Sequence, residues 1–228
     1  MASKQEKAFR KLRREFGRIP NRELAERIYL GKIGLFDSRH ATFDWRTNLE
    51  SFGLNVKPVI DTGDLPIVNE LYSSDSDISL DFSLTENKYG SVTVQFQNEY
   101  SIVTQAYELN TENYEIQALE EELNHKIINQ GFHWDLNWII VTQIYTCSSY
   151  TLLINSARDS KITINTGVPI AMTSFNIADP HLNLGIKSYR NMAYNCIGNK
   201  NVVPFFVMHQ LKKVAGSNRY QLKRFGRI

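Results

Sequence analysis

The sequence predicts an α+β protein built on a twisted, mainly antiparallel β-sheet with helices packed on it. Between residues 78 and 109, apolar and polar side chains alternate, which is the pattern of strands with one buried and one solvated face. Residues 137–189 are dense in β-branched and aromatic residues, which favour strands. Residues 112–129 instead repeat apolar side chains at three- and four-residue steps, which indicates an amphipathic helix.

The composition is that of a folded domain made in a reducing compartment. The 228 residues suffice for one domain, and a hydrophobic content of 42% is ordinary for a globular protein. No apolar run has the length of a transmembrane helix, and no secretory signal is recognisable. Cys147 and Cys196 lack metal-type spacing, so we expect buried, reduced thiols and a cytoplasmic protein. We expect one domain over residues 1–214 and a short tail over residues 215–228.

Charge is distributed unevenly along the chain. Residues 1–32 hold ten Lys or Arg and four Glu, and residues 212–228 hold six basic residues and no acid. The stretch between them holds ten basic and twenty acidic residues. Basic ends on an acidic body indicate contact with a polyanion or an anionic membrane, docking of the ends onto the body, or two solvated tails.

A basic amphipathic helix is predicted over residues 4–16. Phe9, Leu12 and Phe16 form its apolar stripe, and Gly17 and Pro20 end it. An aromatic stripe among Lys and Arg fits the interface of an anionic membrane, and a surface helix docked on the core is the alternative. The side chains that would contact lipid are Lys4, Lys7, Phe9, Arg10, Lys11, Arg13 and Arg14.

The strongest periodic signal predicts a β-meander over residues 78–109. Two strands are joined by a turn at residues 86–90, and a third strand runs from residue 100 to residue 109. One face is apolar, and the other carries Ser, Thr, Asp and Gln. The apolar positions of the first two strands are Ile78, Leu80, Phe82, Leu84, Val92, Val94 and Phe96.

The helix predicted over residues 112–129 is followed by a long ribbon of strands. Thr111 or Asn110 is expected to cap the helix, and Gly131 to end it in the left-handed conformation. Strands are predicted over residues 138–146, 150–155, 161–166, 182–187 and 202–212. The apolar positions of the ribbon are Ile139, Val141, Ile144, Leu152, Ile154, Ile162 and Ile164.

The motifs of the common enzyme classes are missing from the sequence, including nucleotide-binding, zinc-protease and nucleophile-elbow signatures. His125 and His133 flank the end of the predicted helix and, with Asp135 or Glu121, can make a metal or acid–base site; ordinary surface histidines are the alternative. The strands do not interleave aromatic residues with Lys or Arg, so nucleic-acid binding is not expected. We expect a protein that is not an enzyme and has no cofactor.

Taken in order, these segments resemble the pore-forming N-terminal domain of gasdermins, in the compact bacterial or fungal form. The likeness covers most of the chain: a basic first helix, an amphipathic hairpin region, an acidic helix and a second ribbon. Residues 202–212 look like the closing strand of that family, and residues 140–146 look like a strand of its second hairpin. Bacterial members often carry an acylated N-terminal cysteine, which Met1-Ala2-Ser3 does not offer.

The resemblance implies a gasdermin-like fold and a pore-forming function. Two hairpin regions would lengthen into membrane strands, and many copies would close into a pore that causes lytic cell death. Anionic lipids, further copies of the chain and an activating protease are the implied partners, with a cytoplasmic resting form and an active form at the cell membrane. The tail would restrain the domain through Leu222, Phe225 and Ile228. Trypsin-like cleavage points in it are Arg219, Lys223 and Arg224.

Two other functions compete with this one. A soluble binding or immunity-type module would dock an acidic partner through the basic ends and would ignore liposomes. A hydrolase or metal enzyme would be centred on His125 and His133, which metal analysis tests.

Overall fold

The computed structural model describes residues 19–21, 27–37, 42–54, 56–61, 71–73, 78–170 and 176–225. The predicted helix over residues 4–16, with its expected lipid-contacting side chains, lies outside these ranges, as does Ile228. The chain divides into two compact units. Unit 1 comprises Met1–Phe16, Asp64–Leu109 and Thr146–Pro204, and unit 2 comprises Gly17–Gly63, Asn110–Tyr145 and Phe205–Ile228.

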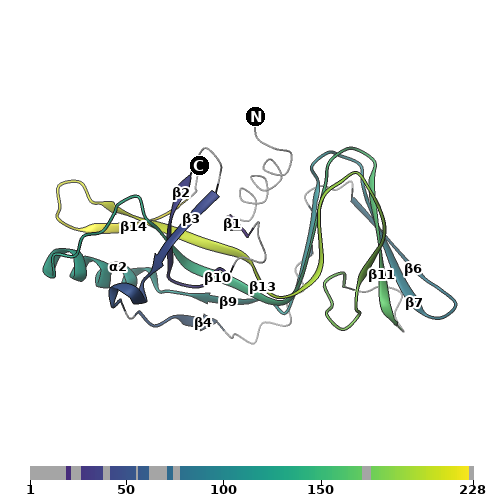
Figure 1. The fold of residues 1–228 in the computed structure, drawn as a ribbon, viewed down its shortest axis with the longest axis horizontal. Coiled ribbons are helices and arrows are strands. Elements are labelled where there is room, and N and C mark those ends of the chain that lie inside the picture. Colours follow the sequence, from purple (N-terminus) through teal and green to yellow (C-terminus); the bar gives the residue numbers. More distant parts are fainter. Residues whose placement is uncertain are drawn as a thin grey trace. The chain divides into compact units, whose positions relative to one another are not determined.

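Most of the regular structure is β-strand (Figure 1). The strands are β1 (Ile19–Pro20), β2 (Lys32–Asp37), β3 (Thr42–Asn48), β4 (Val59–Asp61), β5 (Leu71–Ser73), β6 (Ile78–Leu84), β7 (Tyr89–Phe96), β8 (Ile102–Tyr107), β9 (Asn110–Asn113), β10 (Ile139–Asn155), β11 (Ser160–Pro169), β12 (Gly185–Arg190), β13 (Met192–Lys213) and β14 (Tyr220–Arg224). The expected mainly antiparallel sheet is confirmed.

The strands form two sheets. Sheet A has ten strands with β1-β13-β10-β2-β3 as its main path, and β14, β8, β9, β5 and β4 join it at the sides. Sheet B has four strands in the order β12-β11-β7-β6 and lies within unit 1. Sheet B therefore consists of two hairpins, β6–β7 and β11–β12, paired through β7 and β11.

Unit 2 packs one α-helix, α2 (Ile116–Asn124), against strands of sheet A. Leu119 and Leu123 of α2 are fully buried beside Ile140 of β10 and Leu211 of β13. A π-helical turn, η2 (His125–Asn129), continues α2. Gly131 follows with φ +65°, the left-handed conformation that the sequence predicted at the end of this helix.

The helices are fewer and shorter than predicted. In the described part of the chain they are α2 with η2 and one 3₁₀ turn, η1 (Glu50–Phe52), so the expectation of several helices packed on the sheet is not confirmed. The helix also starts later than residue 112, because residues 110–113 form β9 and pair with β10 and β4. Its N-cap is Glu115 without a side-chain hydrogen bond, so the predicted caps Asn110 and Thr111 are wrong.

The predicted meander over residues 78–109 is only half right. The β6–β7 hairpin forms, but β8 pairs with β10 and β5 in sheet A instead of continuing the hairpin. Ile102 and its neighbours Val103 and Thr104 are all buried, so β8 is covered on both faces as a core strand. The free edge of β7 is taken by β11 instead.

Two strands run through segments that the sequence predicted as polar connections. β10 continues through residues 147–149, because Cys147 and Ser149 are buried within the sheet. β13 begins at Met192 instead of residue 202. In both segments a ladder of backbone hydrogen bonds makes a strand of residues whose side chains are polar.

Part of the C-terminal tail, β14 (Tyr220–Arg224), is a strand of unit 2. β14 pairs with β13, and Leu222, which is 5% exposed, lies opposite Leu211. Side chains of α2 hydrogen-bond to backbone groups on the other edge of β14. Asn124 donates from Nδ2 to the carbonyl oxygen of Tyr220 at 2.8 Å, and its Oδ1 accepts from the Tyr220 amide at 2.7 Å. Glu120 Oε2 accepts from the Leu222 amide at 2.8 Å.

The substitution Asn124→Ala is expected to lower the free energy of unfolding by about 1–3 kcal/mol, because it removes the partner of both backbone groups of Tyr220. Chemical denaturation measures this loss. Gln117→Ala, which removes an exposed side-chain hydrogen bond on the same helix, is the matched control and should stay within about 0.5 kcal/mol of the parent. Equal losses in the two variants would contradict the role given to Asn124.

Candidate functional site: the amphipathic sheet of unit 1

Sheet B is amphipathic across all four strands, because its registers place like side chains opposite one another. Leu80, Val94, Ile162 and Tyr189 are successive register partners from β6 to β12. The next row consists of Asp81, Thr93, Thr163 and Ser188. Since successive side chains of a strand point to opposite faces, one face of the sheet is apolar and the other is polar.

The centre of the apolar face is buried in the core of unit 1. Val92 and Val94 of β7 and Ile162 and Ile164 of β11 are fully buried. They form one cluster with the following buried residues of the same unit: Phe96, Val103, Leu153, Ile170, Ile177 and Leu182. Burying each large aliphatic side chain contributes roughly 1.5–3 kcal/mol, so this face holds the unit together.

The same face becomes exposed toward the edge strands. On β6, the side chains of Phe82 and Leu84 are 37% and 42% exposed. On β12, Ile186 and Tyr189 are 41% and 63% exposed. Large apolar groups on both edges of one sheet are unusual for a surface that stays in water.

The polar face is exposed at many of its positions, and some of its side chains hydrogen-bond across neighbouring strands. The hydroxyls of Thr93 and Thr163 lie 3.1 Å apart across β7 and β11. The side-chain amide of Gln95 donates to Asp81 Oδ2 at 3.0 Å across β6 and β7. Such a face keeps its polar groups satisfied wherever water is present.

A segment over residues 176–184 is pinned beneath the apolar face by backbone hydrogen bonds. The Ile177 amide donates to Gln105 Oε1 at 2.8 Å, and the Thr151 hydroxyl donates to the Ile177 carbonyl oxygen. The Gly167 amide of β11 donates to the Leu182 carbonyl oxygen at 2.8 Å. Ile177 and Leu182 thereby become part of the core that covers sheet B.

The structure brings together only some of the residues predicted to insert into a membrane. Those in sheet B are Ile78, Leu80, Phe82, Leu84, Val92, Val94, Phe96, Ile162 and Ile164. The others lie on β10 in sheet A, where they are buried: Ile139, Val141, Ile144, Leu152 and Ile154. The membrane role of both sets stays a prediction. Ile186 and Tyr189 of β12 were left out of the predicted set, although the alternation over residues 182–187 was a signal for them.

Of the predicted tail residues that the structure describes, Leu222 lies in β14 and Phe225 follows that strand. Phe225 donates its amide to the Met208 carbonyl oxygen at 2.8 Å and places its ring 5.3 Å from that of Phe36. Of the predicted cleavage points, Lys223 and Arg224 lie within the ladder of β14, and Arg219 lies in the turn before it. Arg219 is exposed and lies outside the β14 ladder, which favours it over the other two. Its carbonyl oxygen accepts from the Val214 amide at 2.9 Å and its amide donates to Ser217 Oγ at 3.0 Å, so cleavage there requires this turn to open.

A half-buried histidine lies on β13 beside the end of β14. His209 of β13 is opposite Arg224, and its Nδ1 is hydrogen-bonded to the Thr142 hydroxyl at 2.7 Å. Burial and then the charge of Arg224 lower the pKa of His209 to about 4, so its side chain is neutral at pH 7. The end of β14 is therefore packed against an uncharged imidazole.

The alternative of a metal or acid–base site at His125 and His133 gains no support from the structure. His125 and His133 are exposed, and the His125 ring is hydrogen-bonded to the side-chain amide of Asn129 at 3.0 Å. Among the described residues, no group of three or more His, Cys, Asp or Glu side chains is placed to hold a metal ion. In the same residues no helix has both the length and the apolar character needed to cross a membrane.

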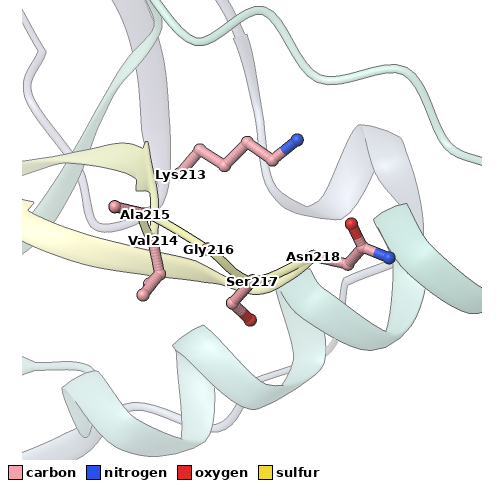
Figure 2. A pocket seen from close by; sticks show the side chains of 6 residues that line it. All are labelled: Lys213, Val214, Ala215, Gly216, Ser217 and Asn218. Carbon is pink, nitrogen blue, oxygen red and sulfur yellow. The ribbon is translucent and has the colours of Figure 1, made fainter.

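The turn between β13 and β14 encloses a hollow lined by one segment. Figure 2 shows this turn beside α2, with Lys213, Val214, Ser217 and Asn218 extending from it. All of its lining residues fall within residues 213–218. A ligand site needs groups that converge from several elements, so this hollow is not a candidate site.

Comparisons with known proteins found structural likeness but no likeness in sequence. No family model matches the chain, and no curated protein matches it. Among solved structures, a bacterial gasdermin from Bradyrhizobium tropiciagri is similar at 7% sequence identity and a TM-score of 0.36, covering 88% of this chain and 84% of that one. That protein is a member of the family which the order of segments in the sequence resembles.

The substitution Gly167→Ala is expected to destabilise unit 1 by about 1–3 kcal/mol, since a new Cβ overpacks a close contact. That Cβ would lie 2.6 Å from the carbonyl oxygen of Asn183. This oxygen belongs to the backbone, so relieving the overlap requires a shift of the main chain. Thermal or chemical denaturation measures the effect. Gly185→Ala in β12 is the matched control, because its Cβ would meet nothing within 4 Å. If both alanines have the same effect, the close packing of this segment is not what stabilises the sheet.

Proposed function

We propose that this chain is a gasdermin-like pore-forming protein whose sheet B inserts into an anionic membrane. The observation that supports this best is the continuous apolar face across β6, β7, β11 and β12, backed by a continuous polar face. In a membrane pore the first face contacts lipid and the second contacts water. The two hairpins β6–β7 and β11–β12 supply the inserting strands, and lytic cell death is the consequence for the cell.

The strands need to lengthen before they can span a bilayer. A spanning strand has about 9–11 residues. β11 already has ten residues, whereas β6 has seven, β7 has eight and β12 has six. Lipid cannot satisfy unpaired backbone groups, so the edges β6 and β12 must pair with strands of further copies. The active state proposed is therefore a closed homo-oligomer.

Insertion requires the apolar face to leave its present core. In this structure the face is covered by residues such as Val103, Leu153 and Ile177. Lipid chains replace these contacts with equally apolar ones, so the exchange costs little once the sheet has moved. The exposed side chains at the edges, Phe82 and Tyr189 among them, are available to meet the membrane first.

Release from restraint is the second part of the proposal. Strand β14 is paired with β13 and hydrogen-bonded to α2. A protease that cuts in the turn at Arg219 would allow β14 to separate from both. Binding to anionic lipid is assigned to the basic segment over residues 4–16, with the resting protein in the cytoplasm and the active form at the cell membrane. No catalytic group of the chain takes part.

Leakage of a trapped dye from anionic vesicles tests the proposal, with the intact chain and with the chain nicked by limited trypsin treatment. Nicked protein is expected to release dye. Phe82→Asp should lower the rate at least tenfold, because a charge on the lipid-facing side costs on the order of 1–3 kcal/mol per copy. Ser83→Asp, the adjacent position on the polar face, should stay within about twofold of the parent, since the lumen side tolerates charge.

Circular dichroism and gel filtration confirm that each variant is folded before leakage is measured. An absence of leakage with intact and nicked protein, both folded, would remove the pore-forming proposal. Equal effects of Phe82→Asp and Ser83→Asp would show that dye is released without insertion of sheet B.

A second candidate is a soluble module that docks an acidic partner. Its support is the β13–β14 hairpin, where Lys212, Lys213, Arg219 and Lys223 are exposed. None of them makes an ion pair within the described residues. Such a module would bind its protein partner and leave vesicles intact, so the leakage experiment separates the two functions.

A further inference from the structure

One row of the polar face of sheet B carries two positive charges side by side. Ser79, Gln95, Lys161 and Arg190 are successive register partners from β6 to β12. Lys161 and Arg190 are therefore directly opposite each other on β11 and β12, and both are exposed. Like charges directly opposite one another destabilise a sheet, so this pair needs another reason to be present.

No acid in the described part of the chain forms an ion pair with Lys161 or Arg190. Within the four strands of sheet B, the acidic residue is Asp81, and the basic residues are Lys161, Lys187 and Arg190. Asp81 lies on β6, at the opposite edge of the sheet from Arg190, and accepts a hydrogen bond from Gln95. The polar face therefore has an excess of positive charge concentrated at one end of β11 and β12.

We propose that Lys161 and Arg190 make the pore selective for anions over cations. This rests on the pore-forming function proposed above, in which the polar face lines the water-filled channel. Every copy in the oligomer would contribute the same pair at the same height, so the pairs form a ring of positive charge. Rings of basic side chains favour anions, and the low-dielectric wall behind them strengthens the field in the channel.

The neighbouring rows offset this ring only in part, even where the β6 edge of one copy meets the β12 edge of the next. The next row beyond it holds Asp81, Thr93, Thr163 and Ser188, in which one carboxylate stands against three hydroxyls. The row after that contains Ser83, Ser91 and Asn165, which carry no charge. In the four strands the charges of Lys187 and Asp81 offset each other, so the net positive sign equals the contribution of Lys161 and Arg190. Neutralising both is therefore expected to remove the preference.

The test measures the reversal potential across a planar anionic bilayer under a potassium chloride gradient. The protein added is the whole chain after it has been nicked by limited trypsin treatment. A low salt concentration of about 0.01 M on one side keeps the screening length near 30 Å, so that the wall charges act well beyond the channel surface. The parent is expected to show a reversal potential displaced from zero toward the equilibrium potential of chloride. The double variant Lys161→Gln/Arg190→Gln should shift it toward zero, and Lys161→Glu/Arg190→Glu should reverse its sign.

Lys57→Gln is the matched control, because it removes one exposed cation from unit 2 and should leave the potential unchanged. Conductance by the parent without a preference for chloride, or a preference that survives both double variants, would overturn this inference and leave pore formation standing. A folded parent that gives no conductance at all would overturn both. The three results are distinguishable in one experiment.

Discussion

The register between β7 and β11 is the constraint on which the rest of unit 1 depends. It places Val94 opposite Ile162 and Thr93 opposite Thr163, so that two hairpins from distant parts of the chain share one apolar and one polar face. A slip of one residue would turn every apolar side chain of one hairpin toward water. The buried cluster on one side and the charged and hydroxyl-bearing rows on the other both follow from this alignment.

A sheet built in this way can satisfy its apolar face in two environments. In the structure, Ile177 and Leu182 are held beneath the face by Gln105, Thr151 and Gly167, so the core covers it. In a bilayer, lipid chains would take the same place. The polar face needs water in both cases, so under the proposed function one sequence pattern would serve both environments.

Sequence reasoning located the faces of the strands better than their partners. The alternation from Ile78 to Phe96 predicted the β6–β7 hairpin correctly, since side-chain direction is a local property. It could not show that β8 pairs with β10 or that β11 pairs with β7, because pairing between distant segments is decided by tertiary packing. The same limit explains why Cys147, in a polar segment, proved to lie inside a continuous strand, and why residues 110–113 joined β9 instead of the helix.

The central claim is that the apolar face of sheet B exchanges its protein core for lipid while the polar face stays in water. A register shift in β12 pairs Ile186 with Ile164 on the apolar face and Ser188 with Thr163 on the polar face. An environment-sensitive fluorophore can be attached at Ile186→Cys or at Ser188→Cys in a folded chain whose own two cysteines are replaced by alanine. On addition of anionic vesicles to nicked protein, the probe at position 186 is predicted to shift to the blue and to be quenched by a quencher placed in the lipid chains. The probe at position 188 should do neither. Equal responses at the two positions, or no response at position 186 while the vesicles leak, would contradict the account.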